Sequence, residues 1–308
     1  MYYKITHATT YSYKHPVTLS PHVLRLRPRS DVAQTLHRFS LETDPQPIRV
    51  VENIDLDGNA ELRLWFAEEA IATLTITTTS EVETFRTNPF DYLVESWAIQ
   101  LPVNYPASLL TQLQPYLGGQ FLYFSSSVDP VAVQLAEEIW QDTNNTISFL
   151  TTLNQRIHES CKYIVRETGE PFPAGITWTQ KSGSCRDLAV LFVETCRAIG
   201  LAARFVSGYQ SDEPKEAEGE GGDRQTDTQP TPSQEHNLHA WAEVYLPGAG
   251  WRGYDPTQGL AVADHHIALV ASPFARQTVP IVGSLKHGVG TKSDMQYHLS
   301  IAATLVKP

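Results

Sequence analysis

The stretch from residue 183 to residue 200 constrains the fold more than any other part of the sequence. Apolar side chains recur there every three or four residues, which is the spacing of a helix that buries one face. These apolar residues are Leu188, Leu191, Phe192, Cys196 and Ile199. Gly200 follows, where a helix commonly ends on a residue with positive φ. The sequence therefore predicts a buried helix that begins at Cys185, after a glycine-bearing turn.

Cys185 at the start of this helix has two interpretations. The first backbone N–H groups of a helix lack helical acceptors and carry the positive end of the macrodipole, and both features favour a thiolate over a thiol. A free cysteine is also a common small buried residue. The helix alone leaves both interpretations open.

A β-hairpin is predicted further along the chain. Residues 238–246 and 251–257 are rich in aromatic and β-branched side chains, and a Pro-Gly-Ala-Gly turn separates them. Every second residue of the first run shares a face, and on one face these are His239, Trp241 and Glu243. Asp255 ends the second strand, before a proline that stops pairing. A symmetric turn would place Asp255 on the opposite face from His239, so their meeting requires a bulge or an asymmetric loop.

A cysteine, a histidine and a carboxylate are the groups needed for nucleophilic acyl transfer. The thiolate attacks a carbonyl carbon, and the imidazole holds the proton and returns it to the leaving amine. The carboxylate fixes the imidazole tautomer and stabilises its charged form.

Four motifs in order carry a family resemblance. They are Gly-Ser-Cys-Arg-Asp-Leu-Ala (183–189), Ala-Arg-Phe-Val-Ser-Gly-Tyr (203–209), His-Ala-Trp-Ala-Glu-Val-Tyr (239–245) and Gly-Trp-Arg-Gly-Tyr-Asp-Pro-Thr (250–257). Together they resemble the bacterial transglutaminase-like family, within the papain-like cysteine-nucleophile superfamily. The resemblance implies Cys185 as nucleophile, His239 as general base and acid, and Asp255 as the orienting carboxylate.

The resemblance extends to the N-terminal part of the chain. Residues 10–13 (Thr-Tyr-Ser-Tyr), residues 16–17 (Pro-Val), residues 26–29 (Leu-Arg-Pro-Arg) and residues 57–59 (Asp-Gly-Asn) are similar to the β-rich domain that precedes the catalytic core in this family. One segment departs from the pattern. Residues 211–237 are longer and more acidic than expected and carry a net charge of −6, over half of the total of −11.

Pattern and resemblance together predict an α+β fold. An all-β sandwich-like domain is expected over residues 1–100, where β-branched residues alternate and Asp-Gly-Asn marks a hairpin turn. A papain-like, transglutaminase-like core of helices packed on an antiparallel sheet follows over 101–260. Its helices are expected to begin at the N-cap Asp129 and near Thr146. Residues 261–308 are expected to be extended segments that pack back on the body.

The acidic segment 211–237 is predicted to be a flexible insert, since it has no apolar periodicity. The segment ends two residues before His239, so it could form a lid over the site or be a tolerated surface insertion. We favour the surface insertion.

Composition excludes several classes of protein. The 308 residues contain 41% hydrophobic and 19% charged side chains, which is typical of a globular chain. A net charge of −11 argues against nucleic acid as a partner. No apolar run is long enough for a membrane span, and no secretory signal is recognisable, so we expect a cytoplasmic protein without a membrane partner. Three cysteines fit a reducing compartment better than a disulfide framework.

Weaker signals surround the three main residues. Gln180 and Trp178 lie just before Cys185, where a side-chain donor could complete an oxyanion site, although a loop role is the simpler interpretation. Trp241 either walls the cleft or belongs to the core. Asp187 either shapes the site or offsets the macrodipole. The paired His265 and His266 lack the spacing of a zinc site, so no metal and no cofactor is expected.

We interpret the chain as an enzyme that forms a thioester on Cys185 and hydrolyses a peptide or amide bond, as a cysteine peptidase or amidase. Its expected substrate is a peptide, a protein or a small amide. One alternative is transglutaminase cross-linking of a glutamine side chain to an amine. Another is a binding or assembly protein with a relic triad, in which the β-domain recognises a partner. The sequence gives no information on the oligomeric state.

Overall fold

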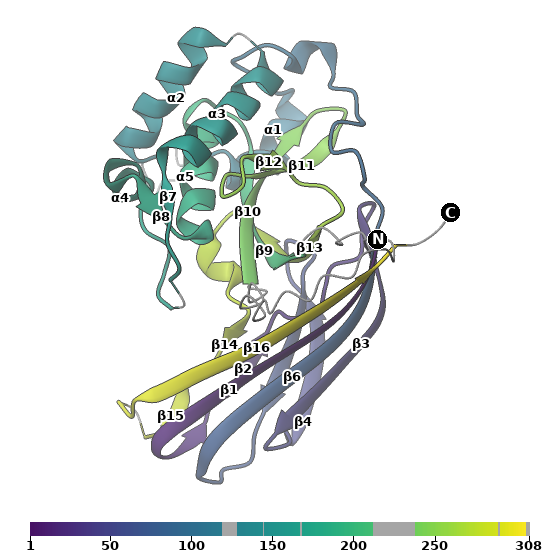
Figure 1. Ribbon diagram of the computed structural model, residues 1–308, viewed down its shortest axis with the longest axis vertical. Helices are drawn as coiled ribbons and strands as arrows, with labels where there is room; N and C mark the ends of the chain where they lie inside the picture. Colours follow the sequence, from purple (N-terminus) through teal and green to yellow (C-terminus); the bar gives the residue numbers. More distant parts are fainter. Residues whose placement is uncertain (119–127, 144, 167, 212–237, 289, 306–308) are drawn as a thin grey trace, which may run out of the picture.

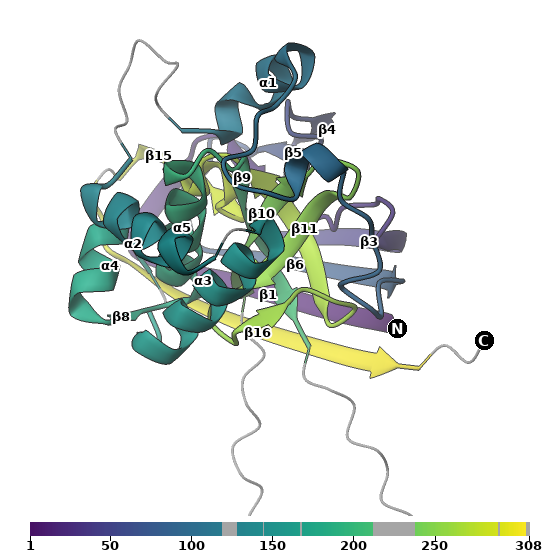
Figure 2. The same cartoon turned by 90° about the horizontal axis from the view of Figure 1, so that it is seen from above.

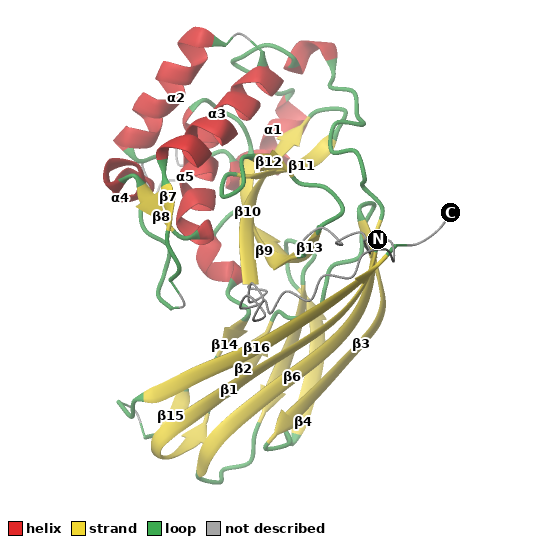
Figure 3. Cartoon of the chain, viewed as in Figure 1, coloured by secondary structure: helices red, strands yellow, loops and turns green. Residues whose placement is uncertain are grey.

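A layer of helices covers a central sheet, and a β-rich region lies beyond it (Figures 1 and 3). The computed structural model describes residues 1–118, 128–143, 145–166, 168–211, 238–288 and 290–305. Apart from Ser211, the predicted acidic insert therefore lies outside the described residues. No helix among the described residues is long and apolar enough to cross a membrane.

The β-rich region contains two antiparallel sheets and draws on both ends of the chain. The first has the order β15-β1-β6-β3, and β16 also pairs with β1. Its strands are β1 (Tyr2–Leu19), β3 (Gln34–Asp44), β6 (Ile71–Thr84), β15 (Leu285–His287) and β16 (Ser293–Thr304). The second has the order β14-β2-β5-β4, with β2 (His22–Leu24), β4 (Arg49–Ile54), β5 (Ala60–Trp65) and β14 (Ile281–Val282).

Alternating side chains explain why these strands form. Apolar residues at every second position of β1 and β6 point inward and meet those of β5 in one buried cluster. Its members include Tyr3, Ile5, Leu62, Leu64, Leu74 and Ile76. The turn predicted at Asp57-Gly58-Asn59 joins β4 to β5, and Gly58 takes a φ of 78° there. The all-β sandwich-like part of the predicted fold is thus confirmed.

Helices α2 and α3 begin where the sequence predicts, at the N-cap Asp129 and near Thr146. Asp129 caps α2 by accepting from the Val131 N–H at 2.9 Å, and Asn145 caps α3 by accepting from the Ile147 N–H at 2.8 Å. The helices are α1 (Ala107–Leu113), α2 (Pro130–Asp142), α3 (Thr146–Ser160), α4 (Ala174–Gln180) and α5 (Cys185–Ala198). Short 3-10 turns are η1 (Ser96–Ala98), η2 (Gln114–Tyr116) and η3 (Ala275–Thr278), and β7 (Lys162–Tyr163) pairs in parallel with β8 (Ser182–Gly183).

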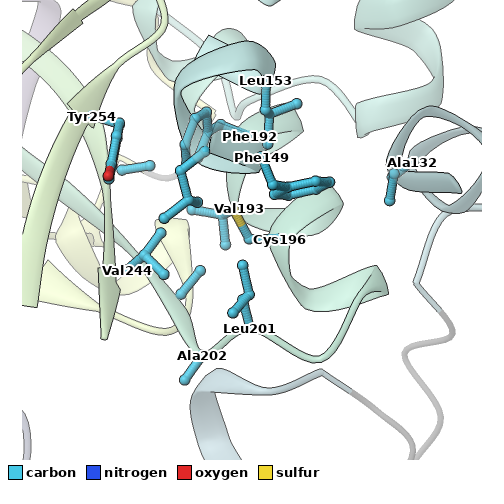
Figure 4. Close-up of a cluster of buried hydrophobic side chains, with 14 of the residues drawn as sticks. Ala132, Phe149, Leu153, Phe192, Val193, Cys196, Leu201, Ala202, Val244 and Tyr254 are labelled. Atoms are coloured by element: carbon cyan, nitrogen blue, oxygen red, sulfur yellow. The ribbon is translucent and has the colours of Figure 1, made fainter. Parts of the chain in front are cut away.

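Helix α5 is the centre of the helical layer. Its inner face packs on α3 and on the sheet through Phe192 and Cys196 (Figure 4). Partners drawn there include Phe149, Leu153, Leu201, Val244 and Tyr254. Cys196 is fully buried, as a core residue is expected to be.

The central sheet is antiparallel, with the order β12-β11-β10-β9-β13. Its strands are β9 (Ala203–Gln210), β10 (Leu238–Leu246), β11 (Gly250–Asp255), β12 (Leu260–Ala261) and β13 (His266–Ser272). Helix α5 packs against β9 and β10 (Figure 2). Helices on one antiparallel sheet, after a β-rich region, confirm the predicted α+β class. The domain boundaries near residues 100 and 260 stay predictions.

Two side-chain amides fasten the β-rich region to the free edge of β13. Gln34 donates to the Ala268 carbonyl at 3.0 Å and accepts from the Ala268 N–H at 2.8 Å. Asn59 makes the same pair of bonds with Ala271, both at 2.9 Å. Each side-chain amide bonds the backbone N–H and C=O of β13 as a residue of a neighbouring strand would. These backbone groups at the edge of the sheet are therefore satisfied without a further strand.

Candidate active site

Cys185 is the first residue of α5 and is buried, with 7% of its surface exposed. The turn before it is held by Asp187, whose Oδ2 accepts from the backbone N–H of Ser184 at 2.7 Å and from its hydroxyl at 2.8 Å. A carboxylate that binds the residue before the helix fixes the first turn. The thiol is therefore presented at the helix N-terminus, as the sequence predicts.

Asp187 also anchors the preceding loop, a role that the sequence left open. Arg166 donates from Nη1 to both carboxylate oxygens at 2.7 Å, and the Phe172 N–H donates to Oδ1 at 2.7 Å. Burial opposes the ionised form of Asp187, but these donors and Ser184 outweigh it and lower its pKa. Asp187 therefore shapes the site indirectly, by fixing the helix that carries Cys185.

His239 and Asp255 meet across the β10–β11 hairpin. The distance from His239 Nε2 to Asp255 Oδ2 is 2.7 Å. Leu246 pairs with Gly250 and Ala242 with Tyr254, so extending the register by one residue brings Asp255 to the face of His239. The loop contains three residues between Leu246 and Gly250 instead of the two of a turn about Gly248 and Ala249, and this difference of one residue puts Asp255 on the face of His239.

Charge and hydrogen bonds set the protonation of this pair. Burial disfavours the imidazolium of His239, but the Asp255 carboxylate, and then Cys185 as a further hydrogen-bond partner, raise its pKa. Burial would raise the pKa of Asp255, but His239 and His266 lower it well below its usual range. Because Nε2 of His239 faces Asp255, Nδ1 is the nitrogen available to Cys185. The three residues proposed from the sequence are thus brought together.

His266 is a further member of the site, which no signal in the sequence indicated. Its Nε2 lies 3.1 Å from the same Oδ2 of Asp255, while the Thr257 N–H donates to Oδ1 at 2.9 Å. His266 had been considered only with His265, as a metal pair without zinc spacing. The ligand atoms of His239, Asp255 and His266 lie within 4.8 Å of one another. No local pattern could have found His266, because it reaches Asp255 from the far edge strand of the sheet.

Trp241 packs against both imidazoles and is 1% exposed. Its ring centroid lies 6.3 Å from that of His239 and 5.1 Å from that of His266. Trp178 and Gln180 are on α4, not in the loop predicted for them. Trp178 lies against the helical core and under the Lys181 ammonium, whereas Gln180 is exposed. An oxyanion role for Gln180 or Trp178 stays a prediction.

Comparison with known proteins agrees with this architecture. Residues 3–83 match the bacterial transglutaminase-like N-terminal region, and residues 133–256 match the transglutaminase-like superfamily. Over residues 133–256 the chain therefore has a transglutaminase-like core. An uncharacterized protein of Mycobacterium tuberculosis is 28% identical over 281 residues, which cover 87% of this chain and 82% of the relative.

Two further likenesses concern proteins with named activities. A protein-glutamine gamma-glutamyltransferase of Pseudomonas aeruginosa is 29% identical over 173 residues, covering 55% of this chain but only 23% of that protein. A crystal structure named "putative cysteine protease" from Cytophaga hutchinsonii has a TM-score of 0.70 at 20% identity, covering 100% of this chain and 93% of that one. The transglutaminase-like core and its relatives support a cysteine-based enzyme.

Proposed function

We propose that Cys185 is the nucleophile of an acyl-transfer reaction that hydrolyses a peptide or amide bond through a thioester. The observation that carries the proposal is the position of His239. Its imidazole is held by the Asp255 carboxylate at 2.7 Å and has Cys185, at the start of α5, as its other partner. A buried carboxylate that favours the imidazolium also favours the thiolate beside it.

The first half of the reaction forms the thioester. The Cys185 thiolate attacks the carbonyl carbon, forming the C–S bond and moving an electron pair onto the carbonyl oxygen. The first N–H groups of α5 have no acceptor within the helix, so they are suited to this oxyanion. As the C–N bond breaks, the His239 imidazolium gives its proton to the leaving amine, and Asp255 keeps the imidazole oriented.

The second half decides between hydrolase and transferase. His239 takes a proton from the attacking molecule, the C–S bond breaks, and the thiolate returns. Water gives an acid, and an amine gives a new amide. We favour water because it is always abundant and no sequence motif points to a dedicated amine site. The likeness to a glutamyltransferase supports the transferase as the second candidate.

A direct test measures the alkylation rate of each cysteine against pH by mass spectrometry, in the wild type and in His239→Ala. Fast labelling of Cys185 alone at about pH 5–6, lost in the variant, is the expected result for a thiolate–imidazolium pair. Labelling only above about pH 8, unchanged in the variant, would indicate an ordinary thiol and favour the binding or assembly protein.

A second measurement separates the two enzymatic outcomes. A peptide library containing glutamine side chains is incubated with the enzyme, with and without a primary amine. Release of acid in both cases supports hydrolysis, whereas diversion of most product to a substituted amide identifies a transglutaminase. A peptide, a protein or a small amide thus stays the proposed substrate class, and a cytoplasmic location stays a prediction.

A further inference from the structure

Asp255 is the meeting point of two histidines, of which the proposed reaction uses one. Oδ2 is bonded to His239 Nε2 at 2.7 Å and to His266 Nε2 at 3.1 Å, and Oδ1 accepts from the Thr257 N–H at 2.9 Å. Asp255 is fully buried, so water cannot replace a missing donor. Its orientation toward His239 therefore depends on all three donors.

The protonation of His266 follows from its surroundings. An ionised carboxylate is only an acceptor, so His266 must carry a proton on Nε2. Among the described residues, Nδ1 of His266 is buried without a hydrogen-bond partner. A second proton there would bury an unpaired N–H of a charged ring. The neutral Nε2–H tautomer is the form that fits, and burial lowers the pKa of His266 accordingly.

The fold reserves space for this contact. His266 begins β13, where it pairs with Gln210 of β9. At Gly208, one strand over from His239, an added Cβ would lie 2.2 Å from the Ile267 carbonyl oxygen and 2.6 Å from the Trp241 ring. The missing side chain lets β13 and the indole approach closely. Trp241 then packs beside both imidazoles, whose ring centroids lie 6.0 Å from each other.

We propose that His266 is a positioning residue for the reaction, a neutral imidazole whose Nε2–H fixes the Asp255 carboxylate in the orientation that His239 needs. This inference rests on the proposed function. His266 itself does not touch the reacting atoms. Its loss leaves the carboxylate with two of its three donors and a less fixed orientation, so the thiolate–imidazolium pair forms over a narrower range of pH.

Binding of a metal ion is the competing interpretation of the same cluster. Two histidines and an aspartate could supply three ligands to zinc. An ion there would have to displace the protons that now join Oδ2 to both imidazoles, and it would separate His239 from Asp255. The observed distances of 2.7 and 3.1 Å are those of hydrogen bonds, so we favour positioning and make zinc binding an outcome of the test.

The experiment compares four variants with the wild type by the iodoacetamide labelling rate of Cys185 from about pH 5 to about pH 9. His266→Leu removes the donor, and His266→Gln restores an amide N–H near the Nε2 position. His266→Asn places its amide near Nδ1 instead. His22→Leu is the matched control, since His22 is also buried but lies on β2, where its Nδ1 is bonded to the Ser20 carbonyl.

We expect His266→Leu to slow labelling at neutral pH by about tenfold and to move the alkaline limb of the profile to lower pH. His266→Gln should recover most of the rate, His266→Asn should not, and His22→Leu should follow the wild type. If His266→Leu does not fold, the labelling rates of His266→Gln and His266→Asn are compared with each other, and a faster rate in His266→Gln supports the inference. Thermal stability measured in parallel separates a loss of fold from a loss of orientation.

Two results would overturn the inference and leave the proposed function standing. One is a wild-type profile in every folded His266 variant, while His239→Ala still loses fast labelling; the proposed function would then stand without His266. The other is stoichiometric zinc binding by the wild type in calorimetry, lost in the His266 variants, with their labelling profiles unchanged. A wild-type protein with an ordinary Cys185 thiol would overturn the proposed function together with the inference.

Discussion

The two sides of the site are assembled in different ways. Cys185 is placed by neighbours in the sequence, because Ser184 and Asp187 fix the first turn of the helix that it begins. His239 is placed by contacts between residues distant in the sequence, since it is bonded to Asp255 on β11, which is in turn bonded to His266 on β13. Local geometry on one side and strand register on the other therefore have to agree before the thiol meets the imidazole.

This comparison teaches where the site is robust. The first turn of α5 should keep its geometry when distant residues are substituted, because its capping bonds join residues only three positions apart. The imidazole side depends on the three-residue hairpin loop, on the close approach at Gly208 and on β13, whose edge is held by Gln34 and Asn59. The β-rich region is thereby connected to the site through the strand that carries His266.

The largest effect is expected when the nucleophile is removed. Cys185→Ala should abolish turnover, a loss of at least about 10⁴-fold, and should leave the fold intact. The thiol belongs to the first residue of α5 and takes part in no capping bond, so the melting temperature should stay close to the wild-type value. Calorimetry with an activity assay checks both. Loss of the fold instead would mean that Cys185 is chiefly a core residue.

The next largest effect tests the imidazole side. Asp255→Asn removes the charge that raises the pKa of His239, so the imidazolium is lost at lower pH than in the wild type. The thiolate–imidazolium pair should then disappear as pH rises toward neutrality, with activity at pH 7 falling by about 10²–10⁴-fold. The pH profile of Cys185 labelling measures this. An unchanged alkaline limb would contradict the assigned pair.

A smaller effect should come from the anchor on the cysteine side. Arg166→Gln removes a cation bonded to both oxygens of Asp187, which is fully buried. Breaking a buried pair costs about 3–5 kcal/mol, and the backbone donors left on Asp187 place the expected loss of unfolding free energy near the lower end. Urea denaturation measures it. Activity in the folded variant should fall less than in Asp255→Asn. A greater fall would mean that activity depends more on the anchor on the cysteine side than on the carboxylate on the imidazole side.

The smallest effect on activity is expected from a change in the acidic segment, which belongs to neither the cysteine side nor the imidazole side of the site. Deletion of residues 213–234, within the acidic segment, should leave kcat/KM within about threefold of the wild type, since charged, aperiodic composition is typical of a surface insertion. Steady-state kinetics on the deletion variant test this. A large fall in kcat at unchanged stability would show that the segment takes part in catalysis.

Much of the fold was accessible from the sequence because its signals are local. The cap Asp129 begins α2, the apolar pattern indicated a helix from near Thr146, and the apolar stripe defines α5. The order of four motifs indicated the superfamily. The sequence did not settle the face of Asp255, because a one-residue difference in the loop reverses it. It also placed Gln180 and Trp178 in a loop, whereas they end a short helix.

The sequence by itself determined that a cysteine begins a buried helix and that a histidine follows on a strand, since periodicity and capping act within a few residues. Only the tertiary structure decided which groups surround the carboxylate. His266 lies eleven residues beyond Asp255 along the chain and reaches it from the opposite edge of the sheet. Strand order, sheet register and the space left at Gly208 produce that contact, and these depend on packing between segments that share no local pattern.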